Sequence, residues 1–224
     1  MSRRALVATL ADRIDAIALP HPTRVGVDGP SAAGKTTLAD EIASALRERG
    51  RHVVRASIDG FHNPPEVRRR RGLLDPQGYL DDSFDLAAVA RELLDPLGPG
   101  GDLSYRPAVH DLASDSARVE EHDRAAADAV LIFDGVLVLR DELAGHWDFS
   151  IYVAVSWDTV VSRGIERDLR PGVDRTDLVA RYRSRYVPGQ QLYVERYAPV
   201  SRADVTVMND DPARAVLVER AERG

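Results

Sequence analysis

Residues 29–37 read Gly29-Pro30-Ser31-Ala32-Ala33-Gly34-Lys35-Thr36-Thr37, and the interpretation of the whole chain starts from them. The stretch matches G-x-x-x-x-G-K-[ST] at every fixed position. Glycines let the backbone turn so that successive N–H groups converge on phosphate oxygens, and a following helix adds the positive end of its dipole. In such a loop Lys35 reaches the β- and γ-phosphates and the Thr36 hydroxyl ligates Mg²⁺. The alternative is a glycine-rich turn that binds nothing.

The segments beside this loop have the pattern that a phosphate-binding loop needs. Residues 23–28 are rich in β-formers, residues 35–49 place Leu38, Ile42 and Leu46 on one helical face, and residues 52–58 form a second β-rich run. Strand, loop, helix and strand in this order make a βαβ unit with a parallel sheet. We therefore predict an α/β fold with three layers, a parallel sheet flanked by helices.

Other elements are predicted from periodicity and from apolar runs. We expect helices at residues 2–18, 84–94, 157–169 and 176–186, and strands at residues 129–133, 149–155 and 205–208. Residues 59–83 are polar and contain several prolines and glycines, so we expect them to be largely irregular. The length of 224 residues predicts one domain, 1–224.

Composition excludes several classes of function. The chain has no cysteine, which rules out disulfides, cysteine-based zinc sites, iron–sulfur clusters and a cysteine nucleophile, and which fits a cytoplasmic protein. The net charge of −6 argues against non-specific nucleic-acid binding. No apolar run approaches the roughly 18 residues of a membrane span, and no secretion leader is evident. Among 30 basic residues Lys35 is the single lysine.

Two carboxylates follow predicted strands. Asp134 ends the apolar run Val130-Leu131-Ile132-Phe133, and Asp59 follows the strand predicted at 52–58. Carboxyl ends of parallel strands share one rim, where ligands bind. Asp134 is therefore a candidate for holding Mg²⁺, with a helix N-cap as the alternative. Asp59 is a candidate for accepting the proton of an attacking hydroxyl, with a capping turn residue as the alternative.

Two groups of arginines are candidates for binding anions. Arg163, Arg167 and Arg170 follow one helical face and precede the helix breaker Pro171-Gly172, so residues 163–175 are a candidate lid over a transferred phosphoryl group. The alternative is a set of surface ion pairs with Glu166 and Asp168. The run Arg68–Arg71 is either a solvated turn of helix or a patch that faces an anion.

Taken together, these motifs resemble the uridine kinase and phosphoribulokinase group of P-loop kinases from about residue 25 to residue 209. The stretches that carry the resemblance are 27–37, Ser57-Ile58-Asp59-Gly60-Phe61, Ser83-Phe84-Asp85, Tyr105 with His110, Ile132-Phe133-Asp134-Gly135, Arg163 with Arg167, and Ala203-Asp204-Val205.

The resemblance implies a P-loop NTPase fold with a small β-ribbon, an arginine-bearing lid and an acceptor-binding insertion at about residues 60–122. It also implies roles for particular residues. Lys35, Asp59, Arg163 and Arg167 would be catalytic, and Asp59 would be the base and help Thr36 and Asp134 to organise Mg²⁺. The acceptor would be contacted by Asp59, Phe61, His62, Tyr105, His110 and Arg170.

The sequence also departs from the pattern of uridine kinases. Asp59-Gly60-Phe61-His62 stands where that group has Asp-Ser-Phe-Tyr, and the Asp-Gly-Phe form is closer to bacterial pantothenate kinases. The resemblance implies a kinase that uses ATP and Mg²⁺ on the hydroxyl of a small molecule. Uridine or cytidine is the first expectation for the acceptor, and pantothenate, a sugar or a sugar phosphate is the alternative.

A function of another class, an ATP-binding switch or assembly module with slow hydrolysis, is also consistent with the phosphate-binding loop. A common GTPase is excluded, because its guanine-reading Asn/Thr-Lys-x-Asp motif needs a second lysine. The sequence leaves the possibility of a homo-oligomer open.

Overall fold

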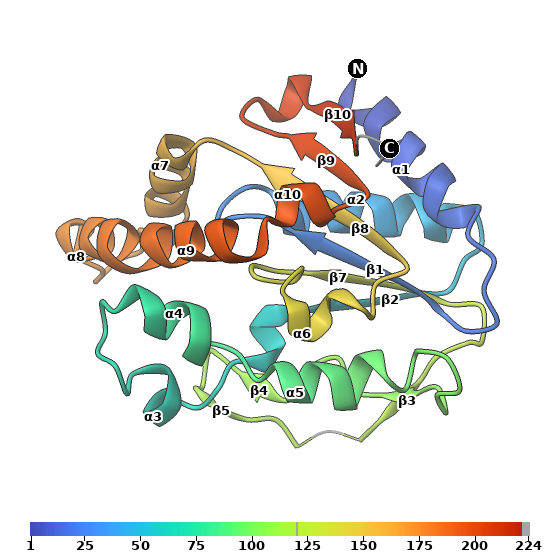
Figure 1. Cartoon of the computed structure of the whole chain (residues 1–224), viewed down its shortest axis with the longest axis horizontal. Helices are drawn as coiled ribbons and strands as arrows, with labels where there is room; N and C mark the ends of the chain where they lie inside the picture. The colour runs from blue at the N-terminus through green and yellow to red at the C-terminus, as the bar shows by residue number, and fades with distance from the viewer. Residues whose placement is uncertain (120, 221–224) are drawn as a thin grey trace.

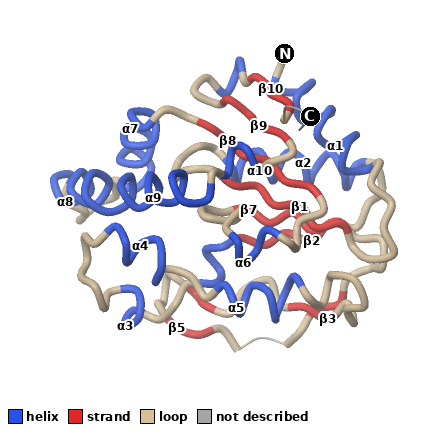
Figure 2. The backbone as a smooth tube through the Cα atoms, in the orientation of Figure 1, coloured by secondary structure: helices blue, strands red, loops and turns tan. Residues whose placement is uncertain are grey.

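A six-stranded sheet runs through the middle of the molecule, with helices on both faces (Figures 1 and 2). The structure is a computed structural model that describes residues 1–119 and 121–220; residue 120 of the expected insertion and residues 221–224 lie outside the description. The strands, in spatial order, are β10 (Val216–Glu219), β9 (Val205–Met208), β8 (Phe149–Ala154), β1 (Thr23–Asp28), β7 (Val130–Asp134) and β2 (Val53–Ser57). Neighbouring strands are parallel, except that β10 pairs antiparallel with β9. The predicted α/β fold is confirmed.

The sheet places its ligand-binding point at the end of β1. β1 lies between β7 and β8. After β1 the chain forms β2 and β7 on one side of this strand, and then β8 and β9 on the other side. Ligands bind at such a reversal of strand order, outside the carboxyl ends of the strands. The register aligns Asp134 with Val27 and with Ser57, so the ends of β1, β7 and β2 share one rim.

Two helices cover one face of the sheet. They are α1 (Arg3–Asp15) and α2 (Lys35–Glu48), and both bury apolar residues spaced three and four apart. Leu38, Ile42 and Leu46 of α2 are fully buried against the alternate residues of β1, β7 and β8 that point to this side. Gly50 follows α2 with φ +84°, the left-handed conformation that ends many helices.

The other face of the sheet is covered by a long insertion after β2 and by α6 (Asp141–Ala144). The insertion forms the lower part of the molecule in Figure 1. Its elements are η1 (Ile58–Phe61), α3 (Pro65–Arg68), α4 (Pro76–Asp82), α5 (Leu86–Val89), the π-helical η2 (Ala90–Leu94), and the short strands β3 (Ser104–Tyr105), β4 (His110–Asp111), β5 (Ser116–Ala117) and β6 (Asp123–Arg124). β3 pairs with β6 and β4 with β5, which gives the expected small ribbon.

The prediction that residues 59–83 are largely irregular is wrong in part, because α3 and α4 lie there. Both helices begin with a proline, Pro65 and Pro76, and Asp75 caps α4 by accepting from the backbone N–H of Gly78. Proline at the first turn costs a helix nothing, since the N–H that it lacks would have no partner there. The prolines that were interpreted as breakers are therefore helix starts.

A helical segment longer than predicted follows β8. It consists of α7 (Trp157–Asp168), a loop, α8 (Arg175–Arg181), the π-helical turn η3 (Tyr182–Tyr186) and α9 (Val187–Tyr197). The helix predicted at 176–186 does not stop there, because the π-helical turn lets it pass Pro188 without a break. The short α10 (Pro199–Arg202) and η4 (Pro212–Arg214) complete the elements. Within the described residues, no helix combines the length and apolarity that crossing a membrane requires.

Candidate active site

The loop between β1 and α2 has the backbone that its sequence predicts. Gly29 has φ +148°, and a Cβ at this position would collide with the carbonyl oxygen of Val153, so only glycine fits. Ala32 and Gly34 also have positive φ angles of +58° and +91°. α2 begins directly at Lys35, so its first N–H groups point back into the loop. This is a nest of backbone donors at the positive end of a helix.

The single lysine lies inside this loop. Lys35 is 8% exposed, and its Nζ donates a hydrogen bond of 2.7 Å to the carbonyl oxygen of Pro30. Burial lowers the pKa of Lys35 to about 8, although the carboxylates of Asp28, Asp134 and Asp59 act in the opposite direction. The ammonium is thus held over the loop by a carbonyl that it can exchange for a phosphate oxygen.

Thr36 and Asp134 meet at the end of the sheet, as expected for a magnesium site. The Thr36 hydroxyl donates to Asp134 Oδ2 at 2.6 Å, and Arg55 of β2 donates to Asp134 Oδ1 at 2.9 Å. Asp134 is 2% exposed and caps no helix, since the next helix, α6, is capped by Arg140. With its hydrogen turned toward Asp134, the Thr36 oxygen keeps its lone pairs free for a cation. Oxygen donors of this kind fit Mg²⁺.

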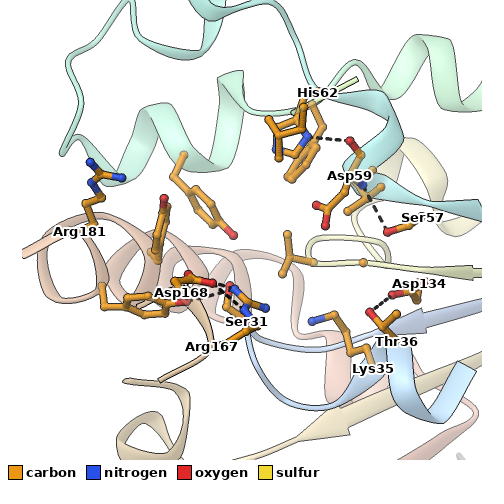
Figure 3. A pocket seen from close by; sticks show the side chains of 18 of the residues that line it. Ser31, Lys35, Thr36, Ser57, Asp59, His62, Asp134, Arg167, Asp168 and Arg181 are labelled. Atoms are coloured by element: carbon orange, nitrogen blue, oxygen red, sulfur yellow. Dashed lines mark hydrogen bonds and ion pairs between the residues drawn. The ribbon is translucent and has the colours of Figure 1, made fainter. Parts of the chain in front are cut away.

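Asp59 lies across from these residues, in the one-turn helix η1. Ser57 caps that turn by accepting from the Asp59 N–H, so the capping role proposed for Asp59 belongs to Ser57. The Asp59 side chain is exposed and, within the described residues, accepts no hydrogen bond. Its charge still acts on Lys35 and Arg167. In Figure 3 the carboxylate points into the space above Lys35.

Two cavities meet at the phosphate-binding loop. The larger, of about 670 Å³, extends from Lys35 and Thr36 past Asp59 to a distant end near Arg181, as Figure 3 shows. The smaller, of about 280 Å³, lies over the phosphate-binding loop on the side of α7. Lys35, Thr36 and Arg167 line both cavities. A ligand in each cavity would therefore bring reacting groups together at these three side chains.

The arginines of the predicted lid are at the site, but they differ in how they are held. Arg163 lines the smaller cavity and donates to the backbone carbonyls of Asn209 and Asp210, the first at 3.1 Å. Arg167 pairs with Asp168 at 2.8 Å and also donates to the Tyr182 hydroxyl. Arg167 thus forms the surface ion pair with Asp168 that was the alternative to a lid. It also lines both cavities.

Arg170 is exposed and lines the larger cavity. It lies in the loop between α7 and α8 and lines the cavity together with Val173. The predicted lid of residues 163–175 is therefore the carboxyl half of α7 plus this loop.

Among the residues predicted to contact an acceptor, His62 lines the larger cavity, and three others lie behind its wall. The ring of His62 packs on Phe84 at 4.6 Å, and burial lowers the pKa of His62. His110 lies 6.5 Å from His62 between ring centroids and bonds Asp115. Phe61 and Tyr105 are buried in the core beneath the sheet, so they support the wall instead of forming it.

The arginine run does not face this cavity. Arg68 and Arg69 pair with Asp115, whereas Arg70 and Arg71 both pair with the buried carboxylate of Asp82. These pairs hold α3 and its following loop to α4 and to the ribbon. The run has more guanidinium groups than carboxylate partners and so keeps some positive charge, but none of its four arginines lines the larger cavity, so the run does not face an acceptor bound there.

Several residues of the site could not be singled out from sequence. Tyr79, Tyr182 and Tyr186 line the larger cavity, and Gln190 of α9 bonds the phosphate-binding loop. Asp28 is fully buried and accepts from the Gly29 N–H, the Leu139 N–H and the Tyr193 hydroxyl. Only Asp28 had a signal in the sequence, its place directly before the loop.

Comparisons with known proteins agree with this geometry. The model of the phosphoribulokinase / uridine kinase family matches residues 24–212. A uridine kinase of Lactobacillus helveticus is 27% identical over 81% of this chain and 86% of its own length. A pantothenate kinase of Corynebacterium diphtheriae is 30% identical over 67% of this chain, but the chain spans only 50% of that relative.

One solved structure extends the range of acceptors among the relatives. A candidate fructose transport system kinase of Silicibacter sp. TM1040 has a TM-score of 0.74, 26% identity, and coverage of 92% of this chain and 98% of its own. The names of these three relatives point to three different acceptors.

Proposed function

Because the chain belongs to the phosphoribulokinase / uridine kinase family, it is a P-loop phosphotransferase, and we propose that it transfers the γ-phosphoryl group of Mg-ATP to a hydroxyl of uridine or cytidine. The observation that carries the proposal is the meeting of the two cavities at Lys35, Thr36 and Arg167. ATP occupies the smaller cavity and the acceptor the larger one. Phosphoryl transfer depends mainly on such positioning and on the neutralisation of charge.

The nucleotide side binds and neutralises the phosphates. The N–H groups of the loop hold the phosphate oxygens, and Lys35 moves its hydrogen bond from Pro30 to them. Mg²⁺, when bound, is held by Thr36, with Asp134 and Asp59 as further oxygen donors, and it neutralises the charge of the phosphates. Arg163 and Arg167 add positive charge from the side of α7.

The acceptor side orients the hydroxyl and removes its proton. Asp59 of η1 lines the cavity, and its carboxylate accepts no hydrogen bond from the described residues. It accepts the proton of the attacking hydroxyl as the new O–P bond forms and the bond from the γ-phosphorus to the β,γ-bridging oxygen breaks, with ADP as the leaving group. Arg170 and Val173, from the loop after α7, line the same cavity and would limit the access of water to it.

Aromatic side chains support a nucleoside as the acceptor. His62, Phe84, Tyr79 and Tyr186 all line the larger cavity, and planar rings of this kind stack on a base. The arginine run does not line this cavity, so it adds no anion site there that would compete with this interpretation. The volume of about 670 Å³ falls within the range of small-molecule pockets.

A second candidate acceptor is pantothenate, and one residue favours it. The guanidinium of Arg181 lines the distant end of the larger cavity and has no carboxylate partner within the described residues. A carboxylate of the acceptor would pair with it. The same group would stay solvated beside an uncharged nucleoside.

The test is phosphate transfer from ATP measured across uridine, cytidine, pantothenate, fructose and fructose phosphate at fixed Mg²⁺. We expect the highest kcat/KM with uridine or cytidine, and no transfer by the Lys35→Ala variant as the background control. A higher kcat/KM with pantothenate, together with its loss in Arg181→Ala, would replace the first acceptor by the second. ATP hydrolysis without transfer to any of them would point to a switch.

A further inference from the structure

Helix α9 connects the acceptor cavity to the phosphate-binding loop. α4, which carries Tyr79 of the cavity wall, lies directly on α9 at Gly189. A Cβ at residue 189 would come within 2.7 Å of Tyr79 Cδ1 and 2.8 Å of the Pro76 carbonyl oxygen. Only glycine lets the two helices approach this closely. The position of Tyr79 is therefore set by α9.

The next residue of α9 reaches the loop. Gln190 is 2% exposed, and its Oε1 accepts from the backbone N–H of Ser31 at 2.7 Å. Its Nε2 donates to Ser31 Oγ at 3.0 Å and lies 3.4 Å from the Tyr79 hydroxyl. One buried amide thus contacts the nucleotide side and the acceptor side at once. An amide that is buried to this degree costs free energy if its partners are lost.

The same helix face makes a second contact with the loop. Tyr193 lies three residues after Gln190, and its hydroxyl donates to Asp28 and accepts from the Leu139 N–H at 3.0 Å. Asp28 in turn accepts from the Gly29 N–H at 2.6 Å. Side chains of α9 therefore hold the phosphate-binding loop at two points, at its beginning through Asp28 and at Ser31. Ser31 also lines the larger cavity and interacts directly with the Tyr79 hydroxyl, and Gln190 reinforces this contact by bonding both side chains.

We propose that Gln190 is a positioning residue through which Tyr79 of the acceptor wall and Ser31 of the phosphate-binding loop stabilise each other. The part that concerns the acceptor rests on the proposed function, whereas the part that concerns the nucleotide does not. Since coupling between two sites is reciprocal, a change at Tyr79 should alter nucleotide affinity more when Gln190 is present than when it is absent.

The first measurement is calorimetric titration of the full-length protein with Mg²⁺ and a non-hydrolysable ATP analogue. Gln190→Met keeps the length of the side chain but removes its hydrogen bonds. We expect the dissociation constant to rise about 3- to 10-fold, the range for one or two lost neutral hydrogen bonds. Gln191→Met is the matched control, because Gln191 is the exposed neighbour on the same helix. Equal affinities of the two variants would overturn the proposal.

The second measurement separates positioning from general loss of structure. Tyr79→Phe removes the hydroxyl that lies near Gln190 and Ser31, and we expect it to weaken nucleotide binding about two- to threefold in the wild-type background and by a smaller factor in the Gln190→Met background. Additive effects would overturn the proposal even if both variants bind more weakly. Neither measurement uses an acceptor, so their outcome is independent of whether uridine or cytidine is phosphorylated.

In turnover, the same variant gives a KM-against-kcat signature. Gln190→Met should raise KM for ATP and for the acceptor together, while kcat stays within about threefold, because Gln190 touches no reacting atom. A fall in kcat without a change in either KM would contradict a positioning role.

Discussion

The two ends of the site are built in different ways. On the nucleotide side, one continuous stretch from Asp28 to Thr37 supplies the backbone donors and Lys35, and among the described residues that line the smaller cavity only the arginines of α7 come from elsewhere. On the acceptor side, η1, α4, the loop after α7, α8, η3 and the segments around His62 and Phe84 each supply one or a few side chains. A site encoded mainly in one segment keeps its geometry through local backbone conformation, whereas a site gathered from many segments depends on how they pack.

The largest expected effect tests the candidate base of the acceptor side, Asp59. Asp59→Asn removes the base and a magnesium donor while it preserves size, so we expect kcat to fall by on the order of 10²–10⁴. Asp128→Asn, the same change at an exposed residue just before β7, at the opposite end of the strands, should leave kcat unchanged. Steady-state kinetics with the best acceptor provide the measurement. Near-normal kcat in Asp59→Asn would move the base to another side chain and weaken the assignment of the acceptor side.

A pH profile tests the nucleotide side alone. Lys35 is charged below its pKa of about 8, and it loses its proton in the free enzyme as the pH rises through that value. We therefore expect kcat/KM for ATP to decline above pH 8 by up to about tenfold per pH unit. At saturating ATP the decline should start at higher pH, because bound phosphates favour the ammonium.

Lys35→Arg is the control for this profile, since a guanidinium stays charged throughout the range. Whatever activity remains in the variant should lack the alkaline decline. A wild-type profile that is flat to pH 10 would contradict the lowered pKa of Lys35.

The smallest expected effect concerns the arginine run. Arg70 is exposed and pairs with Asp82, which keeps Arg71 as a second partner. Arg70→Ala should therefore leave both KM values within about twofold of wild type, as is usual for an exposed ion pair. Arg181→Ala is the informative comparison, because Arg181 does line the acceptor cavity. A large rise in acceptor KM for Arg70→Ala would mean that the run approaches the acceptor after all.

The contrast between the nucleotide side and the acceptor side also explains which features could be predicted from the sequence. The loop at 29–37, the strand before it and the acidic end of β7 were predictable, because each depends on local pattern and on the rule that parallel strands end on one rim. Asp59 was predicted at that rim for the same reason. The solved structure and the family model confirm the predicted fold and the predicted family.

What could not be predicted depends on contacts between distant segments. Phe61 and His62 are neighbours in sequence, yet Phe61 is in the core and His62 faces the cavity, and the geometry of η1 decides between them. Gln190 has no motif, since its role comes from the packing of α9 on α4 and on the loop. The sequence could not decide whether the arginine run was a solvated turn or a patch that faces an anion, because its partners Asp82 and Asp115 are up to 47 residues away.

The solitary lysine of this chain has a consequence for chemical labelling. Apart from the amino group of Met1, the Nζ atom of Lys35 is the only primary amine in the sequence. Its lowered pKa leaves part of it as a free amine near neutral pH, the form that attacks acylating reagents. Incorporation of such a reagent at this one position therefore measures how open the loop is, without any engineered probe.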